Sequence, residues 1–121
     1  MLSADASLLR MFMGESDRYE KQLLYEWIIV QAKAKGLAGA TVLRGSMGFG
    51  ANSHLIHIFK MERLSQDLPI IIELVDTTGK VEDFLLFVEN HIHSGLLATL
   101  EKVDVRFSRA DKSFAPTTPP Q

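Results

Sequence analysis

The sequence predicts an α+β fold of the ferredoxin-like type, a βαββαβ chain whose four-stranded antiparallel sheet carries two helices on one face. Three observations lead to this prediction. Four short segments are apolar or alternate like strands, two longer segments have helical periodicity, and they follow one another in the order β-α-β-β-α-β. Two right-handed β-α-β crossovers that interleave give such a sheet, with both helices packed on the same side.

The first half of the chain supplies a strand, a helix and a second strand. Residues 7–13 form a short, mostly apolar segment that is typical of a strand. In residues 17–35, Asp17-x-x-Glu20 resembles a capping box at the start of a helix. Residues 40–43 are predicted to be the second strand. The apolar residues that share one face of the predicted helix are Leu23, Leu24, Trp27, Ile28 and Ala32.

The second half supplies the remaining elements. Residues 68–75 are the clearest strand, because they contain three consecutive isoleucines and a proline near the start, where a missing donor is tolerated. Their near-continuous apolarity predicts burial on both faces, with Glu73 as the exception. Residues 76–78 are expected to cap a second helix that Gly95 ends, and residues 96–107 alternate as the last strand. The apolar positions of this second helix are Val81, Phe84, Leu85, Val88 and Ile92.

Length and composition limit the classes of protein that the chain can belong to. Residues 1–107 are predicted to form one domain, and residues 108–121, with three of the four prolines, a disordered tail. A formal net charge of −2 gives no basic field for nucleic acid. The lack of cysteine excludes disulfides and thiolate metal sites. Because no run of 18 apolar residues occurs, we expect a soluble, cytoplasmic protein.

Helices on one face leave the other face of the sheet without cover from the same chain. In a chain of this size the simplest cover is a second copy, so the sequence predicts a homo-oligomer. Grooves between its subunits are the expected ligand sites.

Residues 39–50 carry the main functional signal, because a predicted strand runs into Gly45, Gly48 and Gly50. Glycine adopts positive φ without steric cost and leaves backbone N–H groups open to a ligand. Successive N–H groups suit an anion such as phosphate, and a structural turn without a ligand is the alternative. The segment is not a P-loop, since no Gly-Lys-Ser/Thr follows, and it lacks the GxGxxG spacing.

Four motifs resemble the nitrogen-regulatory PII proteins, and most closely a PII-like family named as a domain of unknown function. They are Gly-Leu-Ala-Gly-Ala-Thr-Val at 36–42, Gly-Phe-Gly at 48–50, Leu-Pro-Ile-Ile-Ile-Glu at 68–73 and His-Ser-Gly at 93–95. The likeness runs from about residue 8 to residue 107. It implies a homotrimeric, non-enzymatic signalling protein that binds an adenine nucleotide in clefts between subunits. Such a sensor regulates a partner protein, for which a membrane transporter or channel is the expected class.

The resemblance also implies which residues hold the nucleotide. Thr41 falls where PII proteins place a threonine near the adenine. Gly48, Phe49 and Gly50 match the base of a mobile loop, which here spans residues 51–68.

Two sources of phosphate charge in PII proteins are missing from this chain. The lysine that follows the proline at the loop's end is here Ile70, and a glycine-lysine-rich loop is reduced to residues 94–97. The site is therefore expected to accommodate a mono- or diphosphate more easily than a triphosphate. Backbone N–H groups at Gly45 and beyond would hold the phosphate, with Arg44 or Arg106 as the cation. AMP, ADP and ATP are the expected effectors, and no cofactor is required. The alternative for both arginines is a solvated surface charge.

The histidines and acidic residues suggest no catalytic site. His54 and His57 are spaced H-x2-H, and His91 and His93 are spaced H-x-H, which leaves a divalent-metal protein of the CutA type as the competing function. Neither spacing is diagnostic, so no metal ligand is predicted. No nucleophile, base and orienting group can be placed together, and we predict that the protein is not an enzyme.

Overall fold

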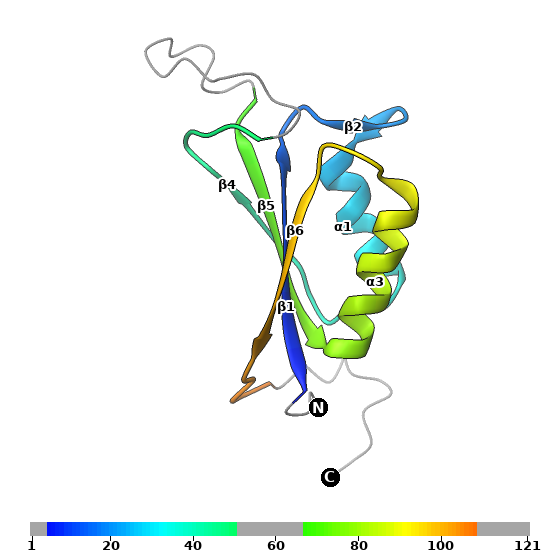
Figure 1. The fold of residues 1–121 in the computed structure, drawn as a ribbon, viewed down its shortest axis with the longest axis vertical. Helices are drawn as coiled ribbons and strands as arrows, with labels where there is room; N and C mark the ends of the chain where they lie inside the picture. The colour runs from blue at the N-terminus through cyan, green and yellow to red at the C-terminus, as the bar shows by residue number, and fades with distance from the viewer. Residues whose placement is uncertain (1–4, 51–66, 109–121) are drawn as a thin grey trace.

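The computed structural model describes residues 5–50 and 67–108, and it has the predicted ferredoxin-like architecture (Figure 1). Four strands form one antiparallel sheet in the order β4-β5-β1-β6, and a β2-β3 hairpin stands apart from it. Both helices, α1 (Leu24–Ala34) and α3 (Thr78–His91), lie on one side of the sheet. The strands are β1 (Ala6–Gly14), β2 (Arg18–Tyr19), β3 (Gln22–Leu23), β4 (Thr41–Arg44), β5 (Pro69–Thr77) and β6 (Leu97–Val103).

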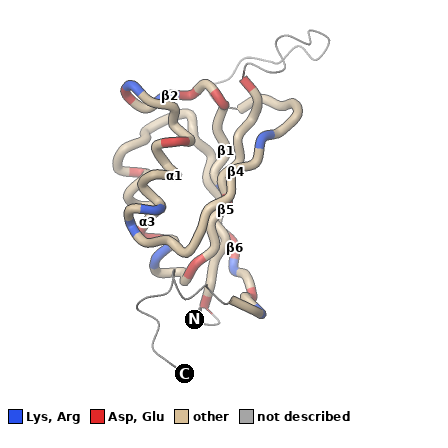
Figure 2. The backbone as a smooth tube through the Cα atoms, turned by 180° about the vertical axis from the view of Figure 1, so that it is seen from behind, with Lys and Arg blue, Asp and Glu red and all other residues tan. Residues whose placement is uncertain are grey.

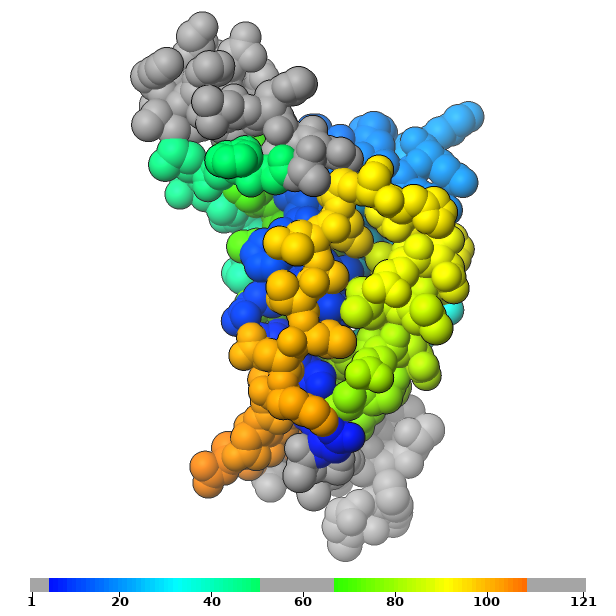
Figure 3. All heavy atoms as spheres, viewed as in Figure 1, coloured from blue at the N-terminus to red at the C-terminus, as the bar shows by residue number. Residues whose placement is uncertain are grey.

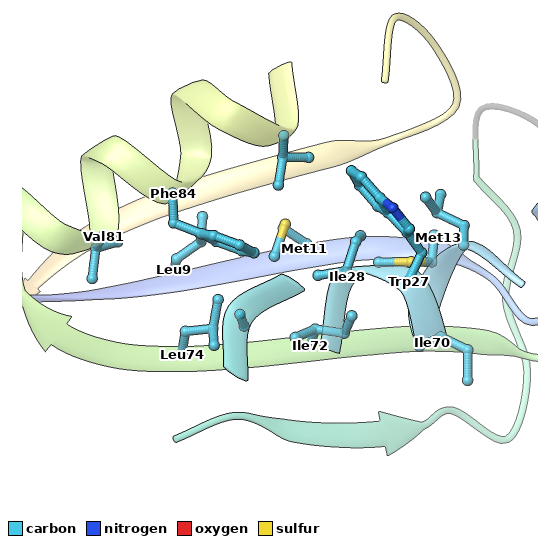
Figure 4. Close-up of a cluster of buried hydrophobic side chains, with 13 residues drawn as sticks. Leu9, Met11, Met13, Trp27, Ile28, Ile70, Ile72, Leu74, Val81 and Phe84 are labelled. Carbon is cyan, nitrogen blue, oxygen red and sulfur yellow. The ribbon is translucent and has the colours of Figure 1, made fainter. Parts of the chain in front are cut away.

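The hydrophobic core lies between the helices and one face of the sheet (Figure 4). Side chains alternate across a strand, so every second residue of the two central strands points toward the helices. The helices pack against them with the apolar faces that their periodicity predicts. The core residues are Leu9, Met11 and Met13 of β1, Ile70, Ile72 and Leu74 of β5, Leu24, Trp27, Ile28 and Ala32 of α1, and Val81, Phe84 and Val88 of α3.

The first helix begins later than the sequence predicts. The β2-β3 hairpin occupies residues 18–23, in which Glu20 has a left-handed φ of 55°, and α1 begins only at Leu24. Asp17 does not cap the helix, because its Oδ2 accepts a hydrogen bond from the backbone N–H of Gly14 at 2.9 Å. The prediction that the helix starts at Asp17 is therefore wrong, and a turn closed by this carboxylate replaces the capping box.

Smaller differences concern the second half of the chain. α3 ends at His91, before Gly95, and β6 ends at Val103, before Phe107. Burial along β5 alternates between buried and half-buried, so the single chain covers one face of this strand and not both. The predicted tail and most of the predicted loop, residues 109–121 and 51–66, lie outside the described residues.

The surface of the described chain shows no concentration of one charge. Figure 2 shows basic and acidic residues mixed along both helices and at the ends of the sheet. In the space-filling view, β6 lies beside α3 at one edge of the sheet (Figure 3). Neither α1 nor α3 contains an apolar stretch long enough to span a bilayer.

Candidate functional site

The glycine segment after β4 packs closely on the ring of Pro69, at the start of β5. A Cβ atom at Gly45 would lie 3.2 Å from Pro69 Cγ, and one at Gly48 would lie 3.0 Å from the same atom. The backbone N–H of Gly45 donates to the carbonyl oxygen of Pro69 at 2.7 Å. Two of the three glycines therefore have a structural reason, because a side chain at either position would crowd the proline ring. A Cβ atom at Gly50 would meet nothing within 4 Å.

A cavity of about 540 Å³ lies where this segment meets the ends of β1 and β6, and we call it the glycine cavity. Its wall is mostly apolar, and its charged residues are Asp17 and Asp67. Asp67 Oδ1 accepts hydrogen bonds from the N–H and the hydroxyl of Ser16 at 3.2 and 2.9 Å. No lysine, arginine or histidine of the described chain lines it. The lining residues are 12–14, Asp17, 47–50, Asp67, Pro69 and 95–97.

A second cavity of about 480 Å³, the threonine cavity, lies at the other end of β4. Thr41 and Glu73 provide its polar side chains, and Val75, Val105 and Phe107 provide much of its apolar wall. The backbone of residues 38–40 completes the wall, together with Ser108.

A buried carboxylate holds this backbone in place. The side chain of Asp76 is only 4 % exposed, and its Oδ2 accepts a hydrogen bond from the backbone N–H of Ala38 at 2.9 Å. Lys80 Nζ adds a hydrogen bond of 2.8 Å to the carbonyl oxygen of Gly36. The sequence suggested Asp76 only as a helix cap. It instead anchors the connection between α1 and β4, across 38 residues of sequence.

The two cavities lie along one track on the sheet. Thr41 begins β4 and Gly45 follows its last residue, so about 13 Å separates them at roughly 3.3 Å per residue. Leu43 and Ile71, which are register partners, lie between them. A nucleoside mono- or diphosphate in an extended conformation has a comparable length, so its base and its phosphates can reach the two ends of this track.

The face of the sheet away from the helices, which we call the open face, carries a polar row across its middle. Thr41, Glu73, Arg10 and Thr99 are successive register partners on β4, β5, β1 and β6. Arg10 Nε donates to Glu73 at 2.9 Å and Arg10 Nη1 donates to Glu101 at 3.0 Å. The bond to Glu73 raises the pKa of the Arg10 guanidinium above its ordinary value.

An apolar row lies next to this polar row. It consists of Leu43, Ile71, Phe12 and Leu97, again register partners across the four strands. Leu43 and Leu97 are 43 % and 59 % exposed. The open face therefore combines an apolar row with a cluster of three paired charges, Arg10, Glu73 and Glu101. Sequence analysis noted Glu73 as an exception in its strand, and its pairing with Arg10 follows only from the register.

The structure separates the two arginines predicted to hold phosphate from the cavities. Arg44 Nη2 donates to Glu15 Oε2 at 2.6 Å, and Arg44 lines neither cavity. Arg106 is exposed in the segment after β6 and also lines neither cavity. Of the predicted site residues, Gly48, Phe49 and Gly50 meet at the glycine cavity and Thr41 lies at the threonine cavity.

The described histidines do not form a metal centre. His91 Nδ1 donates to the carbonyl oxygen of Phe87 at 2.8 Å, and its ring centroid lies 5.5 Å from that of Trp27. Within residues 5–50 and 67–108, no three histidine, aspartate or glutamate side chains are grouped as metal ligands. His54 and His57 lie outside these ranges.

Comparison with known proteins identifies the family. Residues 6–105 match the family model DUF190, described as an uncharacterized ACR. A UPF0166 protein of Aquifex aeolicus is 37% identical over 98 residues, which cover 81% of this chain and 90% of that protein. A UPF0166 protein of Methanocaldococcus jannaschii is 39% identical over 80 residues, which cover 66% of this chain and 72% of the relative.

Solved structures agree on the fold. A Thermus thermophilus protein, described as PII-like and signalling, superposes with a TM-score of 0.58 at 18% identity, over 83% of this chain and 88% of that one. CPII of Thiomonas intermedia, bound to ADP, AMP and acetate, superposes with a TM-score of 0.54 at 14% identity, over 90% of this chain and 92% of that one. The protein therefore belongs to the DUF190 family, and its ferredoxin-like fold is that of the PII-like proteins.

Proposed function

We propose that this protein is a non-enzymatic, cytoplasmic PII-like regulator that binds an adenine nucleotide in clefts between its subunits. The observation that carries the proposal is the pair of cavities at the two ends of β4, along which Thr41 and Gly45 lie about 13 Å apart. In this arrangement the base lies beside Thr41 and the phosphates lie at residues 48–50. A protein of the same fold, CPII, is bound to ADP and AMP, which supports the choice of nucleotide.

The open face supports the proposed assembly. Phe12 and Ile71 are half-buried and Leu97 is exposed in the single chain, so a contiguous apolar row meets water unless another subunit covers it. A homotrimer, the state that the PII resemblance implies, would bury this row and close both cavities on their open side. The ligand site would then be complete only in the assembly.

The charge at the glycine cavity favours a nucleotide with few phosphate groups. Asp17 and Asp67 line it and no described cation does, so each added phosphate charge meets repulsion from two carboxylates. We therefore expect AMP or ADP to bind more tightly than ATP. The bound nucleotide would then change how the protein interacts with a partner protein. The proposed class of partner is a membrane transporter or channel.

Calorimetry with AMP, ADP and ATP on the full chain tests the proposal. Thr41→Val removes the hydroxyl at the proposed base site, and Thr99→Val is the matched control, since Thr99 lies in the same polar row at the opposite edge of the sheet. We expect Thr41→Val to weaken binding about five- to tenfold, the value of one hydrogen bond, and Thr99→Val to leave it unchanged. No heat from any of the three nucleotides at millimolar concentration would refute the nucleotide proposal.

The competing function, divalent-metal binding of the CutA type, depends largely on residues that the structure does not describe. Its direct test is zinc or copper uptake by the wild type and by His57→Ala and His93→Ala. Loss of uptake in these variants, with nucleotide binding absent, would favour the metal protein.

A further inference from the structure

Three strands are joined at one end of the sheet by a set of contacts that we call the clip. The N–H of Glu15 donates to the carbonyl oxygen of Leu68 at 2.8 Å, and the N–H of Gly45 donates to that of Pro69 at 2.7 Å. Arg44 Nη2 then donates to Glu15 Oε2 at 2.6 Å. β5 lies between β1 and β4, so this ion pair connects the ends of the two strands that flank the start of β5.

The ion pair in the clip is only half satisfied. Glu15 Oε1 is buried and has no hydrogen-bond partner in the described part of the chain, although Oε2 has Arg44. A buried carboxylate oxygen without a donor has lost its water without a replacement. The Arg44 side chain is 51 % exposed, so water and salt compete for it. An anionic ligand can compete with Glu15 for the exposed guanidinium of Arg44 in the same way.

Arg44 stands next to the proposed phosphate site. It directly precedes Gly45, and Gly45 and Gly48 pack on the same proline ring. Gly48 lines the glycine cavity. Arg44 is the register partner of the core residue Ile70, so its side chain leaves the sheet on the helix side. Because β4 is an edge strand, a half-exposed arginine at its end can turn around this edge when it leaves Glu15, and arginine pairs well with phosphate oxygens.

We propose that Glu15 is an internal competitor of the ligand phosphate for Arg44. This inference rests on the proposed nucleotide function. In the unliganded clip, Arg44 holds the Glu15 carboxylate, and in the liganded protein it holds a phosphate while Glu15 turns to solvent. Coupling of this kind is reciprocal: the clip lowers the affinity for the phosphate, and the phosphate weakens the clip by the same factor. Glu15 would then set the concentration at which the nucleotide is sensed.

A double-mutant cycle tests the competition in the full-length protein. The variants are Glu15→Gln, Arg44→Gln and the double variant, with Glu20→Gln as a control for the loss of one negative charge nearby. Binding of ADP and of pyrophosphate is measured by calorimetry at fixed ionic strength, after thermal unfolding has shown that every variant is folded.

The competition predicts a specific pattern. Glu15→Gln should tighten ADP binding about fivefold, the upper value of a half-exposed ion pair, and Glu20→Gln by less than about twofold. In the Arg44→Gln background, Glu15→Gln should change nothing. If Glu15→Gln shifts the affinity no more than Glu20→Gln does while the wild type still binds ADP, the competition is refuted and the nucleotide function stands. If the wild type binds neither ADP nor pyrophosphate, both the competition and the nucleotide function are refuted.

Discussion

Asp76 offers the most direct test of how the threonine cavity is built. Its side chain is 4 % exposed, and its two oxygens accept the backbone N–H groups of Ala38 and Thr77 at 2.9 and 2.7 Å. Lys80 Nζ lies 3.8 Å from Oδ2 and adds only a weak ion pair. Asp76→Ala removes both acceptors and leaves the N–H groups of the half-buried Thr77 and of the exposed Ala38 without this carboxylate.

The expected loss follows from these contacts. A hydrogen bond to a charged acceptor contributes about 1.5–3 kcal/mol, so losing two should lower the free energy of unfolding by about 3 kcal/mol, the lower end of the sum, because water can reach the exposed Ala38. Asp76→Asn keeps one acceptor and turns an NH₂ group toward the other donor, so its loss should be about 2 kcal/mol. The predicted order of stability, from highest to lowest, is wild type, Asp76→Asn, Asp76→Ala.

Urea unfolding at one fixed subunit concentration measures these differences, because assembly makes stability depend on concentration. Asp83→Ala, at an exposed position of α3, the helix that follows β5, controls for the loss of a carboxylate. A loss below about 1 kcal/mol for Asp76→Ala would show that the carboxylate does not hold residues 36–40. A folded Asp76→Ala protein should also bind nucleotide more weakly, since the wall of the threonine cavity would be loose.

Three further predictions concern other parts of the molecule. Gly48→Ala should lower the free energy of unfolding by about 1–3 kcal/mol, because its Cβ would lie 3.0 Å from the proline ring; an unchanged urea midpoint would contradict this. Lys102 donates a hydrogen bond to Asp5 and lowers the pKa of its carboxyl group. The stability that this carboxylate contributes is therefore present above its unfolded pKa and is lost as the pH falls through its folded pKa. Asp5→Asn should be less stable than the wild type at neutral pH and equally stable in acid. Leu97→Glu on the open face should dissociate the oligomer in sedimentation, whereas Leu86→Glu on α3, of nearly equal exposure (59% and 57%), should not.

Periodicity was sufficient for the sheet and the second helix. β1 and β5 alternate across a buried face, and α3 presents one apolar stripe, so each element carries its own signal. The same signal was ambiguous at residues 17–23. Asp17-x-x-Glu20 is a local pattern that suits a capping box, and the choice of a hairpin depends on the contact of Asp17 with the end of β1.

The candidate site was predictable only in outline, because its organising contacts join residues far apart in sequence. The glycine segment is visible in the sequence, but the reason for Gly48 is a proline ring 21 positions later, at Pro69. Residues 104–107 alternate like a strand, yet a strand needs a partner, and β6 has its ladder with β1 only up to Val103. The pairing of Arg44 with Glu15 has no local signal at all.

Charge pairing limits what a single subunit can do. Arg10 is held by two carboxylates on the open face, and Arg44 is held by Glu15 in the clip. These two described cations near the track are thus already paired, while the proposed phosphate end is lined by two carboxylates. Among the residues that the structure describes, the charge of a bound phosphate can therefore be compensated by rearrangement of the clip or by a neighbouring subunit.

Arg106 is the candidate for compensation by a neighbour, since it lines neither cavity of its own chain. If a second copy brings its Arg106 to the cleft, ADP affinity should fall when the oligomer dissociates, and Arg106→Gln should weaken binding only in the assembled protein. ADP titrations of the wild type and of Arg106→Gln, at subunit concentrations above and below the point where the oligomer dissociates in sedimentation, separate these cases. Equal ADP affinity in assembled and dissociated protein would mean that one subunit is sufficient, and the nucleotide site would then have to lie within a single chain.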